Sequence, residues 1–131
     1  MKVAFTSKDG ERIDQHFGMA GCFYVWEIGP HEAQLVGKTS AITSAEDEED
    51  RIAARASAIA DCAIVYTMQI GGPAAAKLVS RRIHPMKTGA EVPIAEVVAR
   101  LQEVLRGNPP PWLRKAMGMG ARDAPAPTET E

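Results

Sequence analysis

The chain has 131 residues, of which 45% are hydrophobic and 24% are charged, and its formal net charge is −2. This size and composition predict one globular domain, and the charge argues against bulk binding of nucleic acid. No apolar run approaches the roughly 18 residues of a membrane span, and the first residues do not resemble a signal peptide. We therefore expect a cytoplasmic protein, neither membrane-bound nor bound to nucleic acid, with two free cysteines.

The first third of the chain predicts three consecutive strands. Lys2–Ser7, Cys22–Ile28 and Ala33–Thr39 are short runs with aromatic and β-branched residues, which favour extended backbone. Asp-Gly and Gly-Pro pairs in the connections favour turns. The three strands are expected to form an antiparallel meander.

The acidic run Glu46–Asp50 predicts the start of a helix rather than a metal site. Carboxylates are stabilised at the positive end of a helix dipole. Ser44 and Asp47 have the spacing of a capping box, and apolar residues at helical spacing follow.

The middle of the chain predicts alternating strands and helices. Cys62–Met68 is almost entirely apolar, as expected of a strand covered on both faces. A helix follows the Gly71-Gly72 turn, and Ile83–Thr88 is the last short strand. A final helix starts at Pro93 and carries one apolar stripe, formed by Ile94, Val97, Val98, Leu101, Val104 and Leu105.

The composition changes after Gly107, which is a favourable helix stop. We expect residues 1–107 to form the α/β domain and residues 108–117 to form a proline-rich arm. Residues 118–131 lack core-forming residues and are expected to be a disordered tail. The element order predicts a mixed five-stranded sheet, a meander followed by crossover units, with helices on both faces and the first strand at its centre.

This topology brings two loops to one edge of the sheet. The loop "DQHFGMAGC", which contains His16, leaves the carboxyl end of the first strand, and the Gly71-Gly72 turn leaves the carboxyl end of its expected parallel neighbour. Open α/β folds bind ligands at this edge. Cys22 starts the antiparallel second strand there, whereas Cys62 and His84 begin their strands at the opposite edge, where Cys62 is expected to be a core residue.

The candidate site suits an anion. A helix N-terminus offers free N–H groups, and Lys77 and Lys87 add positive charge. Residues 77–122 carry 9 Lys/Arg against 3 Asp/Glu, which indicates either an ordinary solvated face or a basic surface for an acidic partner. Each lysine is either a ligand contact or a plain surface residue.

The imidazole of His16 and the thiol of Cys22 are suitable ligands for a transition metal or an iron–sulfur species. The alternatives are a hydrogen-bonded structural histidine and a small apolar residue at the start of a strand. The Met19 and Met68 side chains are expected near the same edge. The sequence contains no CxxC pair, no P-loop and no GxSxG motif.

The segments "DQHFGMAGCFYVWEIG", "DCAIVYTMQIGGPAAAKLVSRRIHPMKTG" and "PPPWLRKAM" resemble the nitrogenase iron–molybdenum cofactor-binding family of the NifX/NifY type. The resemblance covers Met1 to Met117. It implies a ribonuclease-H-like fold without nuclease chemistry. His16 matches the family histidine, and Gly71 and Gly72 match its glycine turn, whereas Cys22 lies outside the family pattern.

The resemblance implies a non-catalytic carrier. Such a protein would bind an anionic iron–sulfur precursor of the iron–molybdenum cofactor and pass it from the cluster-synthesising enzyme to the maturation scaffold. The alternative is a chaperone or regulator that binds apo-nitrogenase component 1 or the assembly scaffold. An enzyme is disfavoured, because the sequence offers no nucleophile–base pair and no closed metal site.

Overall fold

The computed structural model describes residues 1–116. The expected disordered tail, residues 118–131, lies outside the described residues. Within residues 1–116, no helix is long and apolar enough to cross a membrane.

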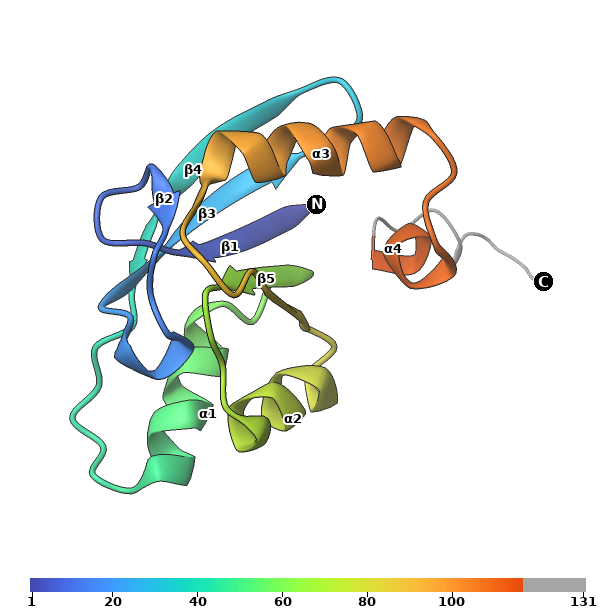
Figure 1. Cartoon of the computed structure of the whole chain (residues 1–131). Coiled ribbons are helices and arrows are strands. Elements are labelled where there is room, and N and C mark those ends of the chain that lie inside the picture. The colour runs from blue at the N-terminus through green and yellow to red at the C-terminus, as the bar shows by residue number, and fades with distance from the viewer. Residues whose placement is uncertain (117–131) are drawn as a thin grey trace.

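A five-stranded mixed sheet forms the centre of the molecule, with strand order β4-β3-β1-β5-β6 (Figure 1). The fold is thus the expected mixed α/β arrangement. In chain order the elements are β1 Lys2–Thr6, β2 Arg12–Ile13, the short 3-10 helix η1 Phe17–Met19, β3 Cys22–Ile28, β4 Ala33–Ser40, α1 Glu48–Ala58, β5 Ile64–Thr67, α2 Gly72–Ser80, β6 His84–Lys87, β7 Val92–Pro93, α3 Ile94–Arg106 and α4 Pro111–Ala116.

Strand β1 is central, as the sequence predicted. It pairs antiparallel with β3, Phe5 lying opposite Tyr24, and parallel with β5, Phe5 lying opposite Tyr66. The β5–β6 pair is also parallel, and β3–β4 is antiparallel. Because β1 and β5 are parallel, the loops that follow them meet at the same edge.

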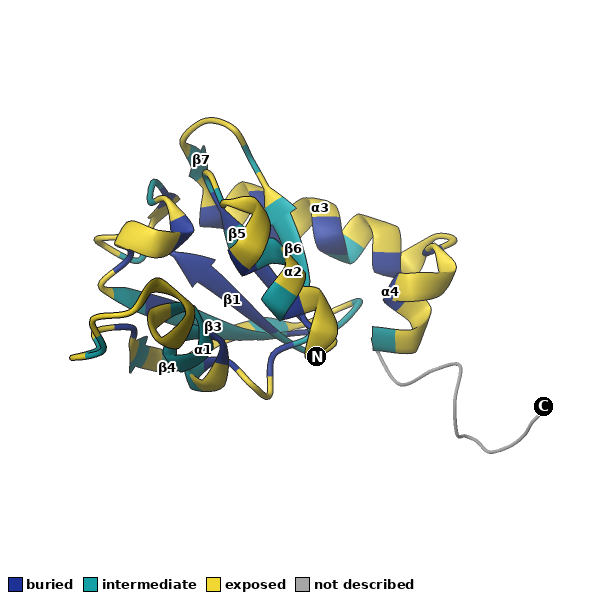
Figure 2. Cartoon of the chain, turned by 90° about the horizontal axis from the view of Figure 1, so that it is seen from below, coloured by how far each residue is buried: buried dark blue, intermediate teal, exposed yellow. Residues whose placement is uncertain are grey.

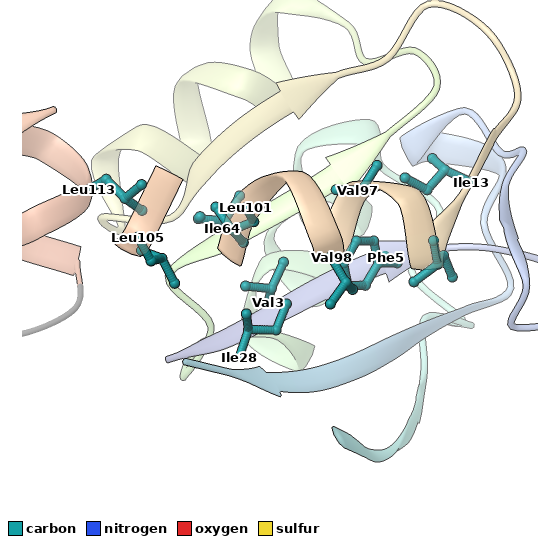
Figure 3. Close-up of a cluster of buried hydrophobic side chains, with 11 residues drawn as sticks. Val3, Phe5, Ile13, Ile28, Ile64, Val97, Val98, Leu101, Leu105 and Leu113 are labelled. Carbon is teal, nitrogen blue, oxygen red and sulfur yellow. The ribbon is translucent and has the colours of Figure 1, made fainter. Parts of the chain in front are cut away.

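Helix α3 covers one face of the sheet, and α1 and α2 lie on the other (Figure 1). Figure 3 shows the apolar stripe of α3 packed against side chains of the sheet strands. Val3 and Phe5 of β1 point into this cluster, whereas the intervening Ala4 belongs to the cluster under α1 and α2. This alternation buries Val3–Thr6 of β1 on both faces, and Figure 2 shows β1 among the buried elements.

Three sequence expectations need correction, and one small ladder was missed. Helix α1 is capped by Asp47, whose carboxylate accepts a hydrogen bond from the Asp50 amide, so the capping box does not start at Ser44. The fifth strand starts at Ile64, two residues after Cys62. Val104 is 41% exposed and lies outside the core stripe of α3. The small ladder between β2 and β7 was not predicted, because two-residue strands leave no periodic pattern.

The described part of the predicted proline-rich arm, residues 108–116, contains a short helix. Residues Pro111–Ala116 form α4, in which proline occupies the first position and needs no N–H partner. Leu113 is 2% exposed and joins the cluster under α3, and Trp112 stacks on His84. The arm therefore docks through two adjacent side chains.

Candidate functional site

The loop after β1 and the loop after β5 continue the pairing of the two strands. The Met68 amide donates a hydrogen bond to the Gln15 carbonyl at 3.0 Å, and the Phe17 amide donates to the Gln69 carbonyl at 2.8 Å. His16 and Gln69 form an isolated parallel bridge. This extension places His16 beside the turn that starts α2.

Two buried threonines bond to the backbone where the two loops meet. The hydroxyl of Thr6 donates to the Gln15 carbonyl at 3.1 Å, and the hydroxyl of Thr67 lies 2.9 Å from the same oxygen. Both threonines are fully buried, where hydrogen-bonding groups need partners. Nothing in the sequence pattern singles them out, because threonine is an ordinary strand residue; only the strand register brings both hydroxyls to one carbonyl.

His16 is exposed and caps η1. Its backbone is extended, with φ −68° and ψ 141°, and its Nδ1 accepts a hydrogen bond from the Gly18 amide at 2.9 Å. Phe17, the next residue, is buried against Phe23 with ring centroids 5.7 Å apart. The buried phenylalanine therefore anchors the loop, and the histidine faces outward.

A pocket of about 440 Å³ opens beside His16, between η1 and the first turns of α1 and α2. In Figure 1 these three segments lie together below the sheet. The predicted site residues His16 and Gly71 both line the pocket, so the structure brings them together. The full lining is His16, Phe17, Gly18, Met19, Glu48, Arg51, Ile52, Arg55, Gly71, Pro73 and Ala74.

Two arginines of α1 supply the positive charge of this pocket. Arg51 and Arg55 are one helical turn apart and thus lie on the same side of α1. The guanidinium of Arg55 donates to the carbonyls of Ala20 and Gly18. Burial, and second the nearby charge of Arg51, lower the pKa of Arg55, which remains a cation in proteins. Sequence reasoning missed both arginines; their spacing of four on a predicted helix was the available signal.

The glycine turn forms the opposite wall. Gly71 precedes α2 with an ordinary φ of −78°, and no side chain caps this helix. A Cβ at Gly71 would meet only a proline carbon at 4.0 Å, and one at Gly72 would meet nothing within 4 Å. Neither glycine is therefore required by backbone strain or internal crowding. Gly71 lines the pocket, whereas Gly72, the first residue of α2, is outside the lining.

Of the three sulfur-bearing candidates, only Met19 lies at the pocket. Met19 lines the pocket and is 75% exposed. Met68 is absent from the lining, and so is Cys22, whose Sγ lies 3.7 Å from the Ser7 carbonyl at the start of β3. Among residues 1–116, no group of three or more His, Cys, Asp or Glu side chains is arranged to hold a metal ion.

The two predicted lysines lie away from the His16 pocket. Lys77 is in the last turn of α2, outside the lining. Lys87 ends β6 and lines a different groove of about 530 Å³, which we call the α3 groove. The α3 groove is formed by Tyr66, Met86, Lys87, Thr88, Val92, Val97, Arg100, Leu101, Val104, Pro110, Trp112 and Leu113.

Cys62 and His84 lie at the opposite edge of the sheet, as predicted. Cys62 is 4% exposed, and burial, with Asp61 as a smaller cause, raises the pKa of its thiol to about 12. His84 pairs with Ile64 at the start of β6, and burial lowers its pKa. Cys62 is therefore an unreactive core thiol.

A family model described as "Dinitrogenase iron-molybdenum cofactor" matches residues 1–104. The chain belongs to this family. The match includes both loops of the His16 pocket and ends within α3. The resemblance to proteins of the NifX/NifY type is thereby confirmed, and the chain is more similar to the NifX type.

Relatives within the iron-molybdenum cofactor family extend the match toward the C-terminus. NifX of Herbaspirillum seropedicae is 43% identical over 122 residues, covering 92% of this chain and 84% of that protein. NifY of Azotobacter vinelandii is 44% identical over 118 residues, covering 90% of this chain but only 48% of that protein, so the chain spans about half of NifY. The crystal structure of PH0822 shares the fold, with a TM-score of 0.58 and 22% identity over 79% of this chain and 89% of that one.

Proposed function

We propose that this chain is a non-catalytic carrier in nitrogenase cofactor biosynthesis, and that its cargo is an anionic iron–sulfur precursor of the iron–molybdenum cofactor. The observation that carries the proposal is the convergence of His16, the uncapped start of α2 and two arginines on one pocket. All three are suited to an anion. The carrier passes its cargo between the cluster-synthesising enzyme and the maturation scaffold.

The open pocket suits cargo that is handed on. His16 is the one imidazole at the pocket, and the pocket lining has no thiol. A cluster held by charge, backbone N–H groups and one side chain leaves without breaking a full set of coordinate bonds. In this proposal Gly71 and Gly72 admit the cargo to the helix N-terminus, Arg51 and Arg55 replace the lysines as the cations at the pocket, and Cys22 takes no part.

Several finer assignments belong to the same proposal. An antiparallel meander of β1, β3 and β4, followed by β5 and β6 added parallel beside β1, supports a ribonuclease-H-like fold. A relative named "FeMo cofactor biosynthesis protein NifB", from Bradyrhizobium diazoefficiens, is 29% identical over 126 residues and supports assembly proteins as partners. We place the carrier in the cytoplasm and assign its cargo binding to residues 1–107, with 108–117 as an arm.

Anaerobic titration tests the proposal. The purified chain is mixed with an iron–sulfur cofactor precursor and passed through a desalting column. We expect the colourless chain to retain the brown colour of the cluster in a saturable amount, and to lose it to the maturation scaffold. A chain that elutes without iron at every concentration would contradict a carrier role.

The α3 groove favours a second candidate, a chaperone that binds apo-nitrogenase component 1 or the scaffold. The groove is apolar, with Val104 41% and Trp112 38% exposed beside it, and it lies across the sheet from the His16 pocket. Co-elution of the cargo-free chain with purified apo-component 1, abolished by Val104→Glu but kept by His16→Asn, would favour this candidate.

A further inference from the structure

Arg55 fastens η1 to α1. Its Nη1 donates to the Ala20 carbonyl at 2.5 Å, and its Nη2 donates to the Gly18 carbonyl at 3.0 Å. A guanidinium holds two acceptors in a fixed fork, which a single ammonium group cannot reproduce. The two bonds join residues 35 and 37 positions apart in the chain. Arg55 thereby fixes the position of Gly18 relative to the helix that forms the pocket wall.

Gly18 in turn fixes the chemistry of His16. Its amide donates to Nδ1 of the imidazole at 2.9 Å. A neutral imidazole has one N–H and one lone pair. Because the lone pair at Nδ1 accepts this hydrogen bond, the proton of the neutral ring must reside on Nε2.

This tautomer determines what His16 offers to a ligand. Coordination of a metal through Nε2 needs the lone pair there, and it moves the ring proton to Nδ1, where it faces the Gly18 N–H. Two donors would then oppose each other, and the cap of η1 would be lost. The resting loop therefore presents Nε2 as a hydrogen-bond donor.

We propose that Arg55 is a positioning residue that holds His16 as the Nε2–H tautomer, so that His16 contacts the cargo by donating a hydrogen bond to an anionic sulfide or oxygen instead of ligating a metal. This inference rests on the proposed carrier function for the identity of the cargo. It explains how a histidine retains a metal–sulfur anion and still releases it, because no coordinate bond has to break.

The first test reads the tautomer in the cargo-free chain. Nitrogen-15 NMR of the histidine side chains at about pH 8, above the ordinary histidine pKa, distinguishes Nε2–H from Nδ1–H. We expect His16 to be purely Nε2–H, with Nδ1 shifted by an accepted hydrogen bond. Arg55→Lys, which keeps the charge but not the fork, should move the His16 signals toward tautomer averaging.

Arg51→Lys is the matched control, because Arg51 bonds to the Glu46 carbonyl and not to η1. It should leave the His16 signals unchanged. An Nδ1–H or averaged His16 in the unmodified chain, or equal responses to both lysine variants, would overturn the inference.

The second test separates a donor from a metal ligand. Tetrathiomolybdate is a dianion whose metal is already saturated by sulfide, so that it accepts hydrogen bonds but offers no site to an imidazole. His16→Gln carries an N–H near the position of Nε2, whereas His16→Asn preserves the cap of η1 but is too short to reach the cargo. We expect His16→Gln to bind tetrathiomolybdate like the unmodified chain, and His16→Asn to bind about tenfold more weakly, the effect of one hydrogen bond to a charged group.

If His16→Gln binds as weakly as His16→Asn, or if neither change matters, the donor role is wrong. The same comparison with an iron–sulfur precursor must give the same order. If the unmodified chain binds no metal–sulfur anion, the proposed function fails, and the NMR measurement still decides the tautomer on its own.

Discussion

The indole of Trp112 stacks on the imidazole of His84, with ring centroids 3.9 Å apart and the planes inclined by 14°. This contact joins α4 to the start of the edge strand β6. It covers one side of the imidazole, and burial lowers the pKa of His84. A group that titrates thus lies at the contact that docks the C-terminal arm.

Acid should weaken this docking. The folded pKa of His84 lies below its unfolded value of about 6.5, so the stability contributed by the neutral ring is complete above pH 6.5 and is lost as the pH falls through the folded pKa. As the arm undocks, we expect the fluorescence of Trp112 to shift to longer wavelength over that range, because the indole becomes more exposed to water. His84→Phe keeps a stacking ring without a proton and should remove the transition. An unchanged titration in this variant would show that another group is responsible.

Leu113 should be the main anchor of α4. Its side chain is 2% exposed within the cluster under α3. Leu113→Ala should lower the free energy of unfolding by about 2–5 kcal/mol, the usual cost of such a truncation in a core. The exposed neighbour Arg114→Ala is the control and should change it by less than about 0.5 kcal/mol. Urea denaturation measures both, and equal small effects would mean that the arm is not docked in solution.

Cys62 should be protected from alkylation. Burial raises the pKa of its thiol to about 12, so the thiolate that alkylating reagents attack is scarce at pH 8. Iodoacetamide followed by peptide mass spectrometry should label Cys22 first, and Cys62 only after denaturation with urea. Cys62→Ala should remain folded and retain cargo binding. Rapid labelling of Cys62 in the native chain would contradict its buried position.

The glycine turn should be needed by the cargo and not by the fold. Gly72→Ala adds a methyl group to open space at the start of α2, so the thermal midpoint should stay equal or rise slightly. Gly71→Val places a branched side chain beside the pocket and should weaken cargo binding about tenfold or more. Gly37→Val in β4, where a Cβ also meets nothing within 4 Å, is a control distant from the pocket. If Gly71→Val binds cargo as tightly as the unmodified chain, the glycine turn is not part of the binding site.

Arg51 and Lys87 should differ in their effect on cargo binding. Only Arg51 lines the His16 pocket, and Lys87 lines the α3 groove. Each change to Gln removes one positive charge and leaves the net charge of the two variants equal. Arg51→Gln should lower the affinity several-fold and reduce its salt dependence, because screened attraction between charges falls with ionic strength. Titrations at low and high salt, with Lys87→Gln close to the unmodified chain, would confirm the assignment; the reverse order would restore Lys87 as the contact.

The sequence alone determined the order of the strands and helices and two parts of the site, His16 and the Gly71 turn. Runs of β-branched, aromatic and apolar residues between turn signals, together with helical stripes, predicted the element order, and the rule that parallel strands end at one edge brought His16 to the Gly71 turn. These features follow from local patterns and chain topology, which the sequence encodes directly. The same reasoning placed Cys62 and His84 at the opposite edge.

Only the tertiary structure decided which charges belong to the pocket. Lys87 is the last residue of β6 and therefore ends at the predicted edge of the sheet. Its side chain, however, lies among the residues of the α3 groove, on the other face of the sheet. Arg51 and Arg55 lie on a helix that separates the His16 loop from the glycine turn in the chain, and both line the pocket because α1 packs beside η1, to which Arg55 bonds. The tautomer of His16 depends on one amide two residues away. Contacts of this kind depend on how helices pack and which way side chains point, and no periodicity of the sequence records them.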